Sequence, residues 1–171
     1  MMTVDERFMA APAQLCFRVA ADVERWPDIL PHYRWVRFHR KDGFGAGRVE
    51  MAAWREFAPA ARYPTWWVSE MTVSEAEPAI FFEHVDGITR GMHVKWSFAP
   101  RDAGTHVCIT HAWKGPRWPL IGGVAWRHVI GPHFVSFIAR RTLAGIAAEA
   151  ERSARTGDAA MPAKTEPTHA R

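Results

Sequence analysis

Two polar side chains interrupt the apolar faces of predicted β-strands. Along residues 105–113, His111 shares a face with apolar residues, Val107, Ile109 and Trp113. Along residues 65–73, Ser69 shares a face with Trp67 and Met71. Imidazole suits proton transfer because its pKa lies near neutrality, and a hydroxyl can orient a carbonyl or hold water. Acid–base chemistry is one interpretation. The other is that both are core residues whose polar atoms find a partner, as buried polar groups normally do.

The chain is rich in large aromatic residues, with nine Trp and ten Phe against two Tyr among 171 residues. Each such ring buries a large area and needs space at interior packing density. One seam between a helix and a sheet cannot take all nine indoles, so we expect some of them to line a cavity. An exposed aromatic interface for a partner protein is the alternative.

The elements that must position these residues are seven antiparallel strands and a few helices. Alternating patterns bounded by turn signals predict the strands Thr3–Phe8, Tyr33–Arg40, Arg48–Phe57, Thr65–Val73, Ala79–Val85, Met92–Ala99 and Thr105–Trp113. Two short helices should follow the first strand: one begins near Ala11-Pro12-Ala13, and the second covers Val23–Leu30, with Asp22 as its N-cap and Pro27 limiting its length.

The longest helical pattern is an apolar stripe at i, i+3, i+4 and i+7 that runs from Val135 to Ala150 and should lie on the sheet. Gly131-Pro132 either begins this helix or kinks a longer one that starts near Val124. From Ser153 onward the residues are small, polar or Pro without a period, so we expect a disordered tail. The prediction is therefore one folded domain, residues 1–152, and a tail, residues 153–171.

Composition and charge exclude several classes of function. The net charge of +4 is mildly basic and no run of Lys and Arg forms a stripe, which argues against a nucleic-acid partner. Cys16 and Cys108 form no CxxC pair, so we expect no metal, no disulfide and a reducing, cytoplasmic setting. No signal peptide and no apolar stretch of bilayer length is seen, so no membrane span is expected. Nothing points to a cofactor, and the oligomeric state stays open.

The order of the predicted elements resembles the helix-grip fold of the START-like (SRPBCC) superfamily, in its polyketide cyclase/dehydrase and lipid transport group. Ala11-Pro12, Phe17, Ala21 to Pro27 and Leu30 to Tyr33 are similar to the opening "AP…VF…v.DverWP..lP" of these proteins, and Gly104 to Val107 resembles their "GT.v" turn. The resemblance spans Thr3 to Arg152. It implies an α+β helix-grip fold, in which a curved seven-stranded antiparallel sheet wraps around a long C-terminal helix, with two short helices after the first strand.

Within this group the chain is most similar to bacterial aromatic polyketide aromatase/cyclases. Trp26 and Tyr33 have the spacing of a Trp–Tyr pair in those proteins, and His111 stands where they place Gln or His. Their pocket strand reads W-x-S-x-R, whereas this chain has Met71 at the arginine position; Arg55 and Arg90 are candidate substitutes.

The resemblance implies a cavity that folds a poly-β-ketone chain and promotes aldol cyclisation and dehydration. The catalytic residues implied are His111, Tyr33 and Ser69, and the substrate-binding residues are Trp26, Trp67, Met71, Phe82, Met92, Val94, Trp96, Ile109 and Trp113. The partners implied are a hydrophobic small molecule and, as a candidate, an acyl carrier protein.

The alternative is a non-catalytic carrier of a hydrophobic ligand such as an isoprenoid quinone or a lipid. Coenzyme-Q-binding relatives share a similar opening motif, "DVE.yP.flP", and an apolar pocket suffices for them. His111 would then be a core histidine. The Trp26-Pro27 pair and Tyr33 favour the catalyst, whereas Met71 favours the carrier. An interaction module of the ribosome-association toxin branch is a third hypothesis, with no special need for a polar group in the pocket.

Overall fold

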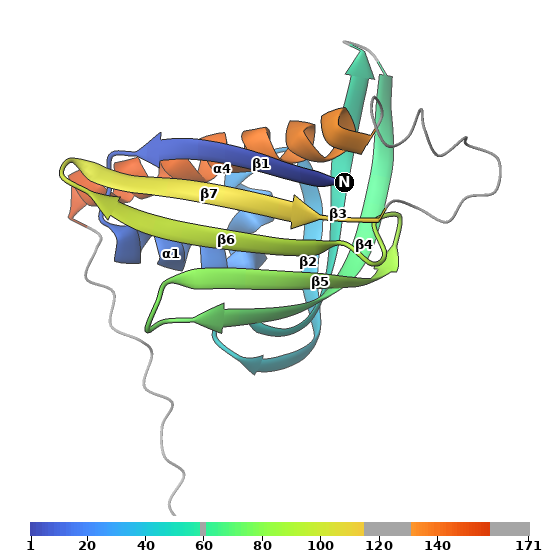
Figure 1. Cartoon of the computed structure of the whole chain (residues 1–171), viewed down its shortest axis with the longest axis horizontal. Helices are drawn as coiled ribbons and strands as arrows, with labels where there is room; N and C mark the ends of the chain where they lie inside the picture. The colour runs from blue at the N-terminus through green and yellow to red at the C-terminus, as the bar shows by residue number, and fades with distance from the viewer. Residues whose placement is uncertain (59–60, 115–130, 158–171) are drawn as a thin grey trace, which may run out of the picture.

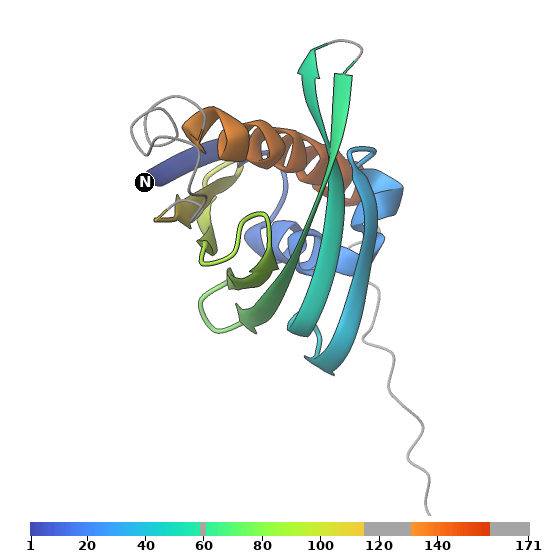
Figure 2. The same ribbon diagram turned by 90° about the vertical axis from the view of Figure 1, so that its right-hand side faces the viewer.

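The computed structural model describes residues 1–58, 61–114 and 131–157, and these form one curved sheet against one long helix (Figure 1). The strands are β1 (Met2–Met9), β2 (Tyr33–Gly43), β3 (Ala46–Ala58), β4 (Ala61–Ser74), β5 (Ala79–Gly87), β6 (His93–Arg101) and β7 (Gly104–Ala112). All neighbours pair antiparallel in the order β1-β7-β6-β5-β4-β3-β2. Figure 2 shows the sheet curling around the helix. The predicted helix-grip fold is confirmed, with β2, β3 and β4 longer than the sequence indicated.

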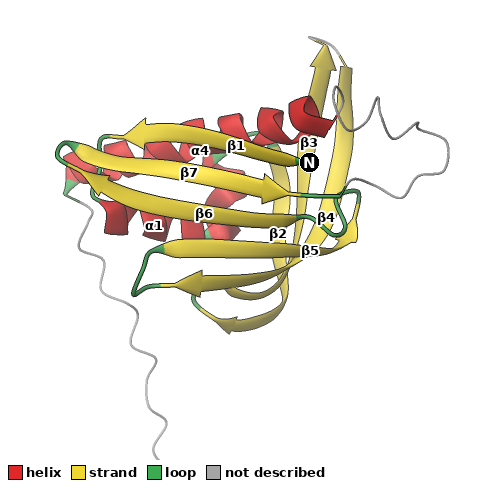
Figure 3. Cartoon of the chain, viewed as in Figure 1, coloured by secondary structure: helices red, strands yellow, loops and turns green. Residues whose placement is uncertain are grey.

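The helices all lie on the concave side of the sheet (Figure 3). They are α1 (Ala13–Ala21), a 3₁₀ turn η1 (Val23–Arg25), α2 (Trp26–Ile29) and α4 (Gly131–Thr156). The single helix expected over Val23–Leu30 is thus split in two. Pro27 has no N–H to offer the Val23 carbonyl, and that carbonyl accepts from the Trp26 N–H instead. Asp22 stands at the N-cap position, but its side chain makes no capping hydrogen bond.

Helix α4 packs its predicted stripe on the sheet, burying Val135, Ala139, Leu143, Ile146, Ala147 and Ala150. The described helix begins at Gly131; the alternative start near Val124 lies outside the described residues. It continues to Thr156, beyond the Arg152 boundary expected for the folded domain. The tail prediction otherwise falls on residues 158–171, also outside the described residues, and stays a prediction.

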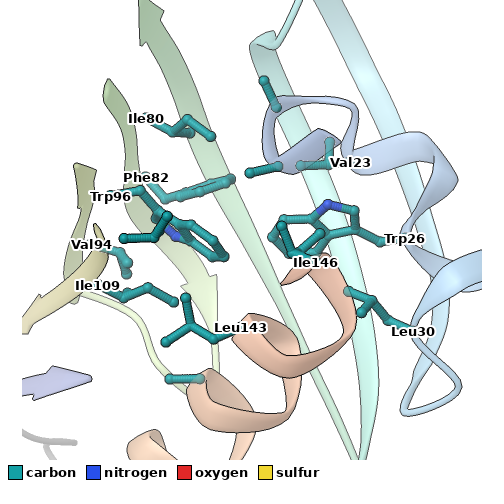
Figure 4. Packing of buried hydrophobic residues seen from close by; sticks show 14 of the residues in the cluster. Val23, Trp26, Leu30, Ile80, Phe82, Val94, Trp96, Ile109, Leu143 and Ile146 are labelled. Carbon is teal, nitrogen blue, oxygen red and sulfur yellow. The ribbon is translucent and has the colours of Figure 1, made fainter. Parts of the chain in front are cut away.

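The segment that follows α2 packs on α4 through a close contact between Leu30 and Gly145. A Cβ on Gly145 would lie 2.1 Å from Leu30 Cδ2, so only glycine leaves Leu30 its place against the helix. The Tyr33 N–H then donates to the Leu30 carbonyl at 2.9 Å, and Leu30 N–H to the Trp26 carbonyl at 2.7 Å. These bonds hold Trp26, the first residue of α2, and Tyr33, the first residue of β2, over the inner face of the sheet. Figure 4 shows Trp26 facing Phe82 and Trp96 across this core.

Candidate ligand cavity

A cavity of about 80 Å³ lies between the sheet and α4. Six strands, the turn between β5 and β6, α2 and α4 contribute to its wall. The lining residues are Trp26, Tyr33, Met51, Thr65, Trp67, Phe82, His84, Ile88, Thr89, Met92, Val94, Trp96, Ile109, His111, Val135, Ile138, Ala139 and Thr142. All predicted site residues are among them except Ser69, Met71 and Trp113.

These three residues are buried elsewhere. Ser69 is fully buried, and its Oγ has no hydrogen-bond partner among the described residues. Met71 is part of the hydrophobic core. The Trp113 indole N–H donates to the Arg90 carbonyl at 3.1 Å. The structure therefore does not bring Ser69 to the cavity that holds His111 and Tyr33.

The two arginines considered as substitutes at the Met71 position do not line the cavity either. Arg55 is buried on β3 with its guanidinium 5.9 Å from the Phe137 ring centroid. Burial lowers the pKa of Arg55 to about 9. Arg90 is exposed in the turn between β5 and β6. No Asp, Glu, Lys or Arg occurs among the described lining residues.

His84 is a site residue that the sequence analysis missed. Its Nδ1 lies 2.6 Å from Thr89 Oγ1, and its ring stacks on Trp67 with centroids 5.8 Å apart and planes at 10°. The signal was present, because His84 follows Ile80 and Phe82 at the alternate, inward positions of β5. The parity argument that singled out His111 on β7 applies to it equally.

Both imidazoles are held in the neutral form. Burial lowers the pKa of His84 to about 3, and the neighbouring imidazoles of His111 and His93 act in the same direction. Burial lowers the pKa of His111 to about 4, against the opposing effect of Asp5. His111 Nδ1 lies 3.3 Å from Thr3 Oγ1, on the neighbouring strand β1. At pH 7 each ring offers one hydrogen-bond donor and one acceptor.

A third polar group enters from the start of β2. Tyr33 packs edge-on to Trp26, with ring centroids 5.0 Å apart. Burial raises the pKa of the Tyr33 phenol, and a hydrogen bond with Thr142 acts in the opposite direction. Thr142 also lies 3.0 Å from His32 Nε2 and donates to the Ile138 carbonyl at 2.9 Å. The phenol thus keeps its proton.

The arrangement combines apolar walls with uncharged polar groups. Aromatic rings and aliphatic side chains suit a flat or folded hydrophobic molecule. The two imidazoles and the phenol can bind its oxygen atoms and exchange protons with them. Among the residues that the structure describes, no group of three or more His, Cys, Asp and Glu side chains is placed to hold a metal ion. None of the described helices has the length and hydropathy to cross a bilayer.

Comparison with known proteins identifies related sequences and folds. A family model described as polyketide cyclase / dehydrase and lipid transport matches residues 9–130. The Zhui aromatase/cyclase from Streptomyces sp. R1128 is 22% identical, with a TM-score of 0.74 over 92% of this chain and 97% of that one. The protein TTHA0849 from Thermus thermophilus is 19% identical, with a TM-score of 0.72 over 90% of this chain and 99% of that one.

A START superfamily protein from Mycobacterium smegmatis is 14% identical, with a TM-score of 0.67 over 88% of this chain and 97% of that one. At these identities the solved structures show a shared fold and nothing about the reaction. No curated protein sequence matches the chain.

Proposed function

The chain belongs to the polyketide cyclase / dehydrase and lipid transport family, and on that premise we propose that its cavity binds a polyketide-like or aromatic molecule and promotes aldol cyclisation and dehydration. The observation that carries the proposal is the aromatic-lined cavity whose wall includes both His111 and Tyr33. A cavity of this kind supplies the two requirements of the reaction, a folded chain and positioned proton-transfer groups.

The proposed reaction needs one base and one hydrogen-bond donor. His111 takes a proton from a carbon between two carbonyls, and the resulting enolate carbon bonds to a carbonyl carbon further along the same chain. That carbonyl oxygen becomes a hydroxyl by taking up the proton that His111 has gained, with the Tyr33 phenol as its hydrogen-bond donor, and His111 is again neutral. Loss of a second C–H proton and of the hydroxyl as water then gives the C=C bond. Ser69 has no step, because it does not line the cavity.

The size of the cavity restricts how a substrate enters. An engineered cavity of about 150 Å³ holds one benzene molecule, whereas this one measures about 80 Å³. A substrate with one or more rings is therefore admitted only when lining side chains change rotamer. Met51 and Met92 line the wall, and their unbranched side chains adapt most easily.

The test is product analysis with a minimal polyketide synthase that builds an octaketide on its acyl carrier protein, the proposed donor of the chain. Adding the protein should raise the share of one cyclised, dehydrated product in liquid chromatography–mass spectrometry. His111→Phe should abolish that effect, and Tyr33→Phe should reduce it about tenfold or more, in line with typical acid–base contributions. His93→Phe, an exposed position on β6, is the matched control and should behave as wild type. An unchanged product profile with wild-type protein would contradict the catalytic proposal.

A carrier of a hydrophobic ligand is the second candidate function. The observation in its favour is the absence of any charged side chain among the described lining residues, since a fixed cation would stabilise an enolate. A carrier purified from its native host should retain an isoprenoid or fatty ligand in native mass spectrometry. Retention of such a ligand together with an unchanged product profile would favour the carrier over the catalyst.

A further inference from the structure

His84 and His111 lie on one face of the sheet, two strands apart. Strand β6 runs between them, with Val94 paired to Phe82 on one side and to His111 on the other. His84 follows Phe82 by two residues and therefore points to the same face. Because neighbouring strands are about 4.8 Å apart, the backbones that carry the two rings are separated by roughly 10 Å across the sheet.

Each imidazole is held through the same nitrogen by a threonine from a different segment. Thr89, in the turn between β5 and β6, contacts Nδ1 of His84 at 2.6 Å, and Thr3 contacts Nδ1 of His111 at 3.3 Å. These contacts leave Nε2 as the ring nitrogen available to a ligand in both cases. A neutral imidazole then presents one donor or one acceptor at Nε2.

The other residues of the cavity wall restrict which ligands these two nitrogens can bind. The stack of His84 on Trp67 fixes the plane of the ring beside an aromatic surface. Among the described lining residues, no Lys or Arg offers a counter-charge to a ligand carboxylate. Burying an unpaired charge costs far more than burying a hydroxyl or a carbonyl that finds a hydrogen bond.

We propose that His84 and His111, once lining side chains have changed rotamer to admit a ring, form a two-point recognition site for an uncharged, flat ring system that carries two hydroxyl or carbonyl oxygens, and that the same site rejects carboxylates. The inference rests on the proposed function only in requiring that the cavity bind a ligand; it holds for a catalyst and for a carrier. In a catalyst, His84 is a specificity-determining residue beside His111 and Tyr33.

The test is calorimetric titration at pH 7 with three naphthalenes that differ only in their substituents: 2,6-dihydroxynaphthalene, 2-naphthol and 2-naphthoate. One added neutral hydrogen bond should make the diol bind roughly 3- to 10-fold more tightly than the mono-ol. The carboxylate should bind at least about tenfold more weakly than 2-naphthol. Binding of 2-naphthoate equal to that of 2-naphthol would overturn the rejection of carboxylates.

Substitutions test whether His84 causes the tighter binding of the diol. His84→Phe keeps a ring against Trp67 and should bring the diol and the mono-ol to equal affinity. Thr89→Val, which keeps the imidazole and removes the hydroxyl on its Nδ1, is the second variant and should reduce the preference. The control His93→Phe, on the opposite face of β6, should keep the wild-type ratio.

The outcomes separate this inference from the proposed function. A wild-type ratio in both the His84 and the Thr89 variants would overturn the recognition site while leaving the cavity a ligand site. Absence of binding by all three naphthalenes would overturn the proposed function and the inference together.

Discussion

Thr142 is the residue through which α4 reaches the polar groups at the start of β2. Its hydroxyl contacts His32 Nε2 at 3.0 Å and donates to the Ile138 carbonyl at 2.9 Å, and it is also the hydrogen-bond partner that acts on the Tyr33 phenol. Because the residue is almost fully buried, these polar atoms have little water to replace a lost partner.

Removing only this hydroxyl should therefore cost stability. Thr142→Val keeps the shape of the side chain, and we expect the free energy of unfolding in urea to fall by about 1–3 kcal/mol. Thr142→Ser keeps the hydroxyl and loses one methyl group, so it should restore part of the difference if hydrogen bonding is the cause. A valine variant as stable as wild type would show that the contacts of Thr142 contribute no net stability.

Strand alternation predicts which face a residue takes, and it does so correctly for Ser69 as well as for His111. Both are buried on the inner side of the sheet. Alternation carries no information on where along that face the core leaves a cavity. It therefore could not distinguish Ser69, which is packed in the core, from His111, which lines the cavity. The position of the cavity depends on how α2 and α4 cover the sheet, a long-range property that one strand does not encode.

At the scale of elements, the wall that carries Trp67 and His84 depends on an irregular pairing of β4 with β5. Trp67 pairs with Gly87 and Val68 with Asp86, but Ser69 pairs with His84, so the register shifts by one residue. A β-bulge of this kind redirects side chains locally. The sequence indicated both strands but not this shift between them.

In this irregular pairing, position 87 requires glycine. Its φ is +86°, and a Cβ there would lie 2.4 Å from the Trp66 carbonyl oxygen and 2.6 Å from Trp67 Cα. The neighbouring atoms are backbone, so they cannot move aside without shifting β4. Gly91, with φ +83° in the same turn, is the matched comparison, because a Cβ added there would meet no atom within 4 Å.

Alanine at the two glycines should separate backbone strain from steric clash. Gly91→Ala should lower the free energy of unfolding by about 1–2 kcal/mol, the cost of a left-handed conformation. Gly87→Ala carries the same strain and the clash, so its loss should be larger by at least about 1 kcal/mol, with weaker binding of naphthalene ligands. Chemical denaturation of both variants measures the difference, and equal losses would show that β4 absorbs the extra atom freely.

At the scale of the whole molecule, the aromatic residues divide between the interior and the outer surface. Trp26, Trp67 and Trp96 line the cavity. Trp35 and Trp54 are half-buried, with the Arg34 guanidinium 4.5 Å from the ring centroid of each, and Trp66 is exposed. The excess of Trp thus fits both hypotheses that the sequence left open, a lined cavity and an outer aromatic surface. Trp118 and Trp126 lie outside the described residues.

The two buried imidazoles should make the stability of the whole chain depend on pH. Above pH 6.5 they are neutral in both folded and unfolded chains. As the pH falls below 6.5, His84 and His111 bind protons in the unfolded chain but not in the folded chain, because their pKa values in the folded chain are about 3 and about 4. The free energy of unfolding should therefore fall, by up to about 1.4 kcal/mol per pH unit for each histidine. The His111 part of this loss should level off below about pH 4 and the His84 part below about pH 3.

Urea denaturation between pH 7.5 and 5 measures this dependence. His84→Phe should remove up to half of the slope. A wild-type stability that stays constant from pH 7.5 to 5 would contradict burial of the imidazoles in the neutral form.

The turn between β5 and β6 is held mainly by hydrogen bonds between main-chain atoms. The Arg90 N–H donates to the Gly87 carbonyl, the Gly91 N–H to the His84 carbonyl and the Met92 N–H to the Thr89 carbonyl, at 3.2, 2.8 and 3.0 Å. Side chains of this turn nevertheless line the cavity: Ile88 and Thr89 near its middle, and Met92 at its end. Mutation could therefore change these side chains while the scaffold persists. Evolution or a protein engineer could alter ligand preference in this chain by exchanging two residues of one turn.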